Sequence, residues 1–289
     1  MVKNILKLLL SIVVYTIVFL LANALLPFSP EFRNSGASEA GDPMSLLFML
    51  FNSAWICFTI YFIIKNTEVN GKKLFIRLLF IMFFVQSFMT QIETLFFTHA
   101  FPVLTRMDIV FIMIAGLFPL LATIPLLMKF FQNKGDALVC SKFSIKRTML
   151  KLGIIGIVYL FVYMIFGYFV AWQFEALRIF YSGSAEKLSF FGQLLNNFNT
   201  NPVIYPFQIL RGILFGVFIL PLVSMIRKSK LIFTASVCLV YLCTGIMLII
   251  PNVLFPDIVR IGHLIEMTSS MLVFGIITGI ILWENNHMK

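Results

Sequence analysis

Long apolar runs constrain the fold more than any other feature of this sequence. Eight stretches carry almost no charge over about twenty residues or more: 6–26, 44–64, 75–97, 107–131, 150–173, 203–226, 231–250 and 259–283. A helix needs about 20 residues to cross roughly 30 Å of hydrocarbon. Only 12% of the residues are charged, about half the share found in soluble domains. We therefore predict an all-α polytopic membrane protein with eight transmembrane helices.

The positions of the basic residues predict its orientation. If the N-terminus is cytoplasmic, 16 of the 22 Lys and Arg residues fall in inner segments and 4 in outer segments. Cytoplasmic loops are enriched in Lys and Arg. We expect a multi-pass protein of the bacterial cytoplasmic membrane with both termini in the cytoplasm. The basic inner loop 132–149 should lie against anionic lipid headgroups. The net charge of +10 thus needs no nucleic acid as a partner.

Two pairs of similar segments indicate an internal duplication. LKLLLSIVVY (6–15) resembles LKLGIIGIVY (150–159), and PVLTRMDIV (102–110) resembles NVLFPDIVR (252–260). We predict one membrane domain, 1–289, made of two four-helix repeats at 1–135 and 145–289. Because each repeat has an even number of spans, both copies would have the same orientation in the membrane.

The N-terminus has a second interpretation. MVKNILK, an apolar run and then Ala22-Asn23-Ala24 resemble a secretory signal with a small-residue cleavage site. Removal of this segment would leave the first repeat one helix short. We therefore expect the first helix to be retained.

Two outer segments are longer than the other outer connections. Residues 27–43 are rich in Pro, Gly and Ser, so we expect irregular structure there. Residues 174–202 carry aromatic and polar residues at helical spacing, which predicts a short helix on the outer surface. The cysteines lie in the apolar runs or in the inner loop, at Cys57, Cys140, Cys238 and Cys243. No outer pair is available for a disulfide.

Ionisable residues inside or at the ends of the apolar runs are the candidate functional groups, because charge in hydrocarbon is costly and usually marks a pathway, a site or a buried pair. They are Glu93, Arg211, Arg260, His263 and Glu266, with Glu175 and Arg178 at an outer rim. From a rise of about 1.5 Å per residue, Glu93, Arg211 and Glu266 lie about 6, 12 and 10 Å below the outer edge. Charges gathered at one level predict a polar cavity open to the outer side.

Spacing along the helices refines this prediction. Arg260, His263 and Glu266 recur every three residues and share one helical face. Gln208 and Arg211 are also neighbours on one face, and Arg211 could pair with Glu93 or with Glu266. If the duplication is real, the first repeat has apolar residues where the second has Arg260, His263 and Glu266, which disfavours a symmetric pore.

Known cofactor chemistries fit these residues poorly. A bis-histidine haem needs two well-placed histidines, but His263 is the single intramembrane one, with His99 and His287 near the two surfaces. A carboxylate-bridged di-metal site needs Glu-x-x-His on two helices, whereas the sequence has one His-x-x-Glu. No nucleotide, zinc-finger or nucleophile-elbow motif is present. We expect no metal and no cofactor.

Three segments resemble blocks of uncharacterised bacterial multi-spanning membrane proteins: FGYFVAWQFEALRIFYSG, PFQILRGILFG and RIGHLIEMTSSMLVFG. This resemblance implies an integral membrane protein and carries no activity. ILRGIL is also similar to the Arg-Gly step of CAAX-type intramembrane proteases. The two glutamates expected before that arginine are replaced by Pro206 and Phe207, so the protease chemistry does not carry over.

These observations lead to three functional hypotheses. The first is a protein that binds or transports an anionic or amphiphilic ligand, such as a lipid, with Arg211 and Arg260 holding an acidic group. The second is an enzyme that acts on a lipid or lipid-linked substrate, with Glu and His as acid–base groups. The third is a structural or signalling subunit whose charges only hold the helices together. Membrane lipids are expected partners in each case, and a homo-oligomer is left open.

Overall fold

The computed structural model describes residues 2–36, 43–132, 144–227 and 229–283. All regular secondary structure in these residues is helical. Eight helical segments there are long and apolar enough to cross a membrane. The predicted all-α fold with eight apolar spans is thus confirmed, and these spans indicate a multi-pass membrane protein. Several positions used in the predictions lie outside the described residues: most of the basic loop 132–149, with Lys134, Cys140 and Lys142, and also Lys228, His287 and Lys289.

The spans consist of the following helices. The first four spans are α1 (Val2–Leu25), α3 (Pro43–Asn66), α4 with η1 and α5 (Gly71–Met82, Phe83–Phe88, Met89–Phe96), and α6 with α7 (Arg106–Ala115, Leu117–Phe131). The last four are α8 with η3 (Ile145–Phe169, Ala171–Gln173), α11 (Ile204–Met225), α12 with η4 (Lys230–Ile246, Met247–Ile249) and α13 (Asp257–Leu282). The shorter helices are α2 (Pro30–Gly36), η2 (Thr98–Ala100), α9 (Glu175–Ser182) and α10 (Phe190–Thr200).

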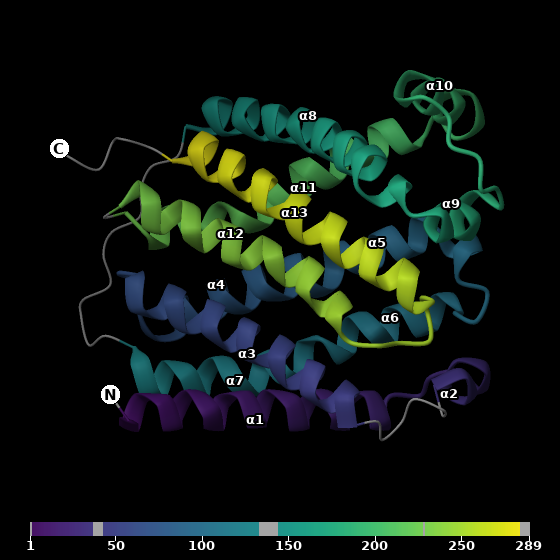
Figure 1. Cartoon of the computed structure of the whole chain (residues 1–289). Coiled ribbons are helices and arrows are strands. Elements are labelled where there is room, and N and C mark those ends of the chain that lie inside the picture. Colours follow the sequence, from purple (N-terminus) through teal and green to yellow (C-terminus); the bar gives the residue numbers. More distant parts are fainter. Residues whose placement is uncertain (1, 37–42, 133–143, 228, 284–289) are drawn as a thin grey trace.

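The spans form a bundle with α1 and α8 at opposite edges, as Figure 1 shows. Helix α1 packs on α3 and α7, and α8 packs on α11 and α13. The central spans α11 and α12 are the most buried, whereas α1 and α8 are the least buried. Large apolar side chains therefore remain exposed along the edge helices. Lipid would cover this surface, because hydrocarbon tails are as apolar as the side chains themselves.

The third span is not a regular α-helix. Its middle, Phe83–Phe88, is a π turn, and Ser87 within it faces Gly116 at the junction of α6 and α7. A Cβ atom on Gly116 would lie 2.1 Å from the Ser87 Oγ. A larger residue at this position would therefore force the Ser87 hydroxyl to move where the π turn meets the junction of α6 and α7. Single-turn π insertions often occur at functional sites, and this one directly precedes the polar residues of α5.

Residues 27–43, which we expected to be irregular, contain the helix α2, so that prediction is wrong for Pro30–Gly36. The hydroxyl of Ser29 accepts a hydrogen bond from the Phe32 amide at 3.3 Å, and Pro30 takes the first helical position. Ser before a helix and Pro at its start are favourable initiating residues. The buried carboxylate of Asp108 also accepts bonds from the Ser29 amide and hydroxyl at 2.7 Å each, which ties α2 to α6. The segment 174–202, for which we predicted one short helix, contains the two helices α9 and α10.

The contact between α8 and α11 depends on a close approach at Gly156. A Cβ atom there would lie 2.8 Å from both the Ile209 carbonyl oxygen and the Ile213 Cγ1, whereas a Cβ atom on Gly153 would meet nothing within 4 Å. We predict that Gly156→Leu destabilises the protein by about 1–3 kcal/mol through overpacking. The matched variant Gly153→Leu, on the same helix, should melt like the wild type. Thermal unfolding in detergent measures both, and equal melting temperatures would contradict this account of the contact.

Candidate functional site

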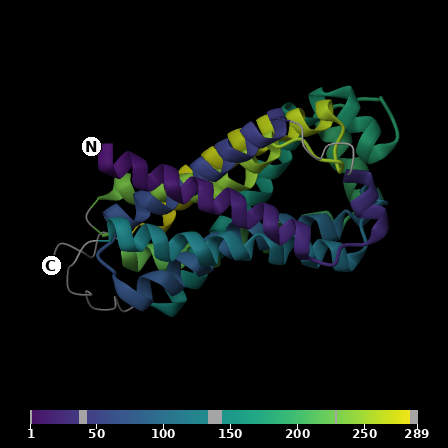
Figure 2. The same cartoon turned by 90° about the horizontal axis from the view of Figure 1, so that it is seen from below.

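A large cavity lies among the ends of the spans near α9 and α10. Its volume is about 890 Å³, and Figure 2 shows the ribbons separating toward this end of the bundle. The lining comes from both halves of the chain, including α1, α5, α8, α10 and α13. Its polar part includes carboxylates, amides and hydroxyls, and its apolar part is rich in aromatic rings. Among the described residues, those that line it include no Lys or Arg.

The strongest interaction at this site is a buried ion pair. Both terminal nitrogens of Arg211 donate to Glu93, with Nη1–Oε1 and Nη2–Oε2 distances of 2.7 Å each. Gln208 supports the pair, because its Oε1 accepts a third bond from Arg211 Nη1 at 2.9 Å. Arg211 is 1% exposed and Glu93 26% exposed. The sequence left Glu93 and Glu266 as alternatives for Arg211, and the structure selects Glu93.

Local structure explains how Glu93 comes to this position. After the π turn, α5 presents Thr90, Gln91, Glu93 and Thr94 to the cavity. These positions form one helical face. The guanidinium of Arg211 lies 5.4 Å from the centre of the Tyr159 ring. The ion pair therefore joins α5 to α11 across the wall of the cavity.

Arg260 is held away from this pair. It donates to the carbonyl oxygens of Leu248 and Ile249 at 3.0 and 2.8 Å, and to Asp257 at 2.7 Å. Its side chain thereby stabilises the turn between α12 and α13. The structure does not bring Arg260 together with Arg211, and neither arginine is among the residues that line the cavity. The expectation that these two arginines jointly hold an acidic group therefore has no geometric support.

His263 and Glu266 do line the cavity, together with Tyr181 of α9. The Tyr181 hydroxyl and His263 Nε2 are 2.9 Å apart, and His263 Nδ1 lies 3.7 Å from Glu266 Oε2. Burial raises the pKa of the Tyr181 phenol. The phenol therefore keeps its proton and can donate a hydrogen bond to Nε2 when that nitrogen carries no hydrogen.

The two residues predicted for an outer rim have different positions. Arg178 is buried and donates to the carbonyl oxygens of Ala185 at 2.9 Å and Trp172 at 2.6 Å. It thus fastens α9 to the segments before and after it. Glu175 is exposed in the first turn of α9. Neither is among the residues that line the cavity.

One wall of the cavity was missed by the sequence analysis. Helix α10 contributes Gln193, Asn196, Asn197 and Thr200, which recur at the i, i+3, i+4, i+7 spacing of one helical face. The signal is readable in QLLNNFNT. The polar spacing in this segment predicted a helix on the outer surface, and it did not indicate that the polar face lines a cavity.

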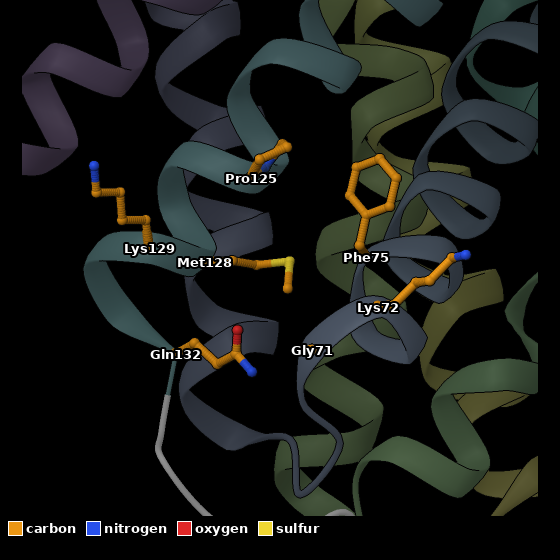
Figure 3. Close-up of a pocket in the computed structure, with 7 residues that line it drawn as sticks. All are labelled: Gly71, Lys72, Phe75, Pro125, Met128, Lys129 and Gln132. Atoms are coloured by element: carbon orange, nitrogen blue, oxygen red, sulfur yellow. The ribbon is translucent and has the colours of Figure 1, made fainter.

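A second, smaller hollow of about 370 Å³ lies at the opposite end of the bundle, between α4 and α7. Figure 3 shows the ammonium groups of Lys72 and Lys129 pointing to opposite sides, away from the space between Met128 and Gln132. The lysines therefore do not converge on one ligand. The cavity near α9 and α10 remains the candidate site.

Comparison with families, with curated proteins and with solved structures finds no match. The function is therefore inferred from the geometry and chemistry of the cavity itself.

The unequal burial of Arg211 and Glu93 predicts unequal mutational effects. Glu93→Gln leaves a buried guanidinium without its carboxylate and should cost on the order of 2–3 kcal/mol. Arg211→Met should cost less, because Glu93 still reaches the cavity, and the double variant should recover most of the loss. Thermal unfolding in detergent measures these effects, with the exposed Glu175→Gln as a neutral control. A harmless Glu93→Gln variant would show that the pair does not stabilise the bundle.

Proposed function

We propose that this protein binds an amphiphilic molecule in the cavity among α5, α10 and α13, and either holds it or moves it within the membrane. One observation carries the proposal, namely a cavity of about 890 Å³ whose lining combines aromatic rings with amides and two carboxylates. This volume is typical of pockets that enclose a small ligand. The aromatic rings suit an alkyl chain, and the polar groups suit a headgroup.

The position of α10 supports access from the lipid. Its amide face lines the cavity, whereas Phe191, Leu195 and Phe198 on its other face are exposed. In water this arrangement would leave three large apolar side chains uncovered, but at a membrane surface lipid would cover them. A ligand that resides in the same leaflet could then reach the cavity beneath α10 without crossing water.

The positions of the charged side chains argue against the anionic ligand that the sequence favoured. An anionic headgroup needs cationic or N–H donors, but Arg211 is occupied by Glu93 and Arg260 by carbonyl oxygens and Asp257. The described lining offers carboxylates instead. The proposal therefore rests on an amphiphilic ligand and not on an acidic one.

A second candidate function is an enzyme that acts on the bound amphiphile. It is favoured by the row Tyr181, His263 and Glu266, whose side chains all line the cavity and approach within 2.9 and 3.7 Å of one another. Such a row can carry a proton between a substrate and the imidazole. The two candidates differ in outcome, because an enzyme changes its ligand in detergent without any gradient, whereas a binding protein returns it unchanged.

Trp172 provides a direct test of ligand binding, because it lines the cavity. In the variant Trp55→Phe/Trp283→Phe it is the single tryptophan left of three. We predict saturable quenching of its fluorescence by single-chain amphiphiles with a brominated alkyl chain, with the protein in nanodiscs. Four probes would share that chain and differ in headgroup, namely a choline ester, a glycerol ester, a glucoside and a phosphate monoester.

The matched control keeps Trp55 as the only tryptophan, through Trp172→Phe/Trp283→Phe. Trp55 lies on α3 and is not among the residues that line the cavity. It should show only gradual, non-saturating quenching by probe dissolved in the lipid. If none of the four probes quenches Trp172 saturably, the proposed function is wrong. Mass spectrometry of the recovered probe separates binding from conversion.

We also propose the finer topology as part of this function, with both termini in the cytoplasm of a bacterial cell and one membrane domain of two repeats. Two correspondences between the halves support the duplication. The first span of each half packs on the second and fourth spans of its own half, and the third span of each half packs on the second span of the other. The cavity end, with α2, α9 and α10, lies opposite the start of α1 (Figure 1).

Cysteine labelling tests the orientation. The three described cysteines are buried, so a Cys140→Ser background provides a low baseline. We predict that Ser184→Cys, exposed beside α9, reacts with a membrane-impermeant maleimide in intact spheroplasts. Ser144→Cys, exposed before α8, should react only after permeabilisation. The reverse pattern would overturn the proposed orientation.

A further inference from the structure

Glu266 has an unusual environment for a carboxylate. It lies on α13, 6% exposed, and lines the cavity. Within the described part of the chain its carboxylate accepts no hydrogen bond, and the nearest cationic candidate is His263 Nδ1 at 3.7 Å, which is too long for a hydrogen bond. The carboxylate faces the cavity with no hydrogen-bond donor of the described residues on it, so a cationic group in the cavity would find an acceptor there.

Glu93, the other carboxylate that lines the cavity, has a charged partner. Glu93 receives two bonds of 2.7 Å from Arg211 and so has its countercharge within the protein. Glu266 lines the same cavity but faces no Lys or Arg among the described lining residues. No Lys or Arg of the described lining balances Glu266, and a positively charged donor in the cavity would do so.

Aromatic rings cluster around Tyr181 and His263, and His263 lies one helical turn before Glu266 on α13. The Tyr181 ring lies 5.4 Å from the His263 ring, 6.1 Å from Phe97 and 6.4 Å from Trp172. Phe255 lies 5.5 Å from His263 on another side. All of these rings line the cavity. Faces of aromatic rings attract cations, more strongly where water is excluded, and carboxylates add to this attraction.

We infer that Glu266, with the rings of Trp172, Tyr181 and Phe255, forms a subsite for the ammonium headgroup of an amphiphile. The inference rests on the proposed function and deepens it by naming the headgroup. The ammonium group lies against the carboxylate and the ring faces, while its chain extends along the apolar lining. The amides of α10 are left to bind the polar group that links headgroup and chain.

Two other headgroups fit these observations less well. A phosphate would place a second negative charge near Glu266 without an arginine to receive it. An uncharged sugar would satisfy the amides of α10 and stack on Trp172, but it would leave the charge of Glu266 uncompensated. Charge balance therefore distinguishes the ammonium group from both.

The four brominated probes test the inference. Wild-type protein should bind the choline ester at least about tenfold more tightly than the glycerol ester, which corresponds to about 1.4 kcal/mol. Glu266→Gln keeps the shape of the side chain and removes its charge. It should abolish that preference while the glycerol ester binds as before, and the exposed Glu175→Gln should leave both affinities unchanged.

A second variant protects the test against misfolding. Phe255→Leu removes one ring face and keeps the carboxylate, so the preference should fall several-fold without vanishing. If Glu266→Gln retains the preference, or if the phosphate or glucoside probe binds most tightly, the ammonium subsite is overturned while the proposed function stands. If no probe binds saturably, the proposed function itself fails.

Discussion

The pair between Arg211 and Glu93 is the interaction on which the rest of the site depends. The Arg211 side chain is 1% exposed within a membrane span, so its positive charge needs a carboxylate partner to offset the cost of burial. The pair therefore fixes α5 against α11 in one rotational setting. That setting turns Thr90, Gln91 and Thr94 toward the cavity as well, because they lie on the same helical face. One ion pair thus positions a complete polar wall.

Two irregular features make this pairing geometrically possible. The π turn at Phe83–Phe88 changes the rotation of the residues that follow it, and Gly116 leaves room for that turn against the fourth span. Arg260 and Arg178 then stabilise the turns around the cavity by donating to backbone carbonyls. The buried residues Arg178, Arg211 and Arg260 therefore stabilise the fold, and the charged groups that line the cavity among the described residues are the carboxylates Glu93 and Glu266. This division explains why a sequence rich in Lys and Arg encloses a cavity with neither residue in its described lining.

The sequence predicted the fold far better than the site, for a physical reason. A helix that crosses hydrocarbon must be apolar over a length set by the bilayer, so composition alone locates the eight spans. A side chain's direction depends on rotation of the helix, and one π turn or one alternative acceptor changes it. Depth correctly grouped Glu93 with Arg211, but it could not show that Arg260 turns to Leu248 and Ile249. Helix α2 was missed because the favourable start at Ser29-Pro30 lay in a segment rich in residues typical of loops.

The amide face of α10 and the carboxylate of Glu266 line the same cavity, and together they affect how that cavity would receive a ligand. Helix α10 lines the cavity with its amide face and exposes Phe191, Leu195 and Phe198 on the other, so in the proposed membrane setting one helix separates the cavity from lipid. The rings of Tyr181 and Phe255 lie within 5.5 Å of the His263 ring, one helical turn before Glu266, so the surroundings of this carboxylate are less polar than bulk water. The electrostatic field of the carboxylate is therefore screened less than in bulk water. In the proposed subsite, a cation that partitions into the same leaflet would meet that field at short range, so the burial of Glu266 would increase the affinity of the cavity for it.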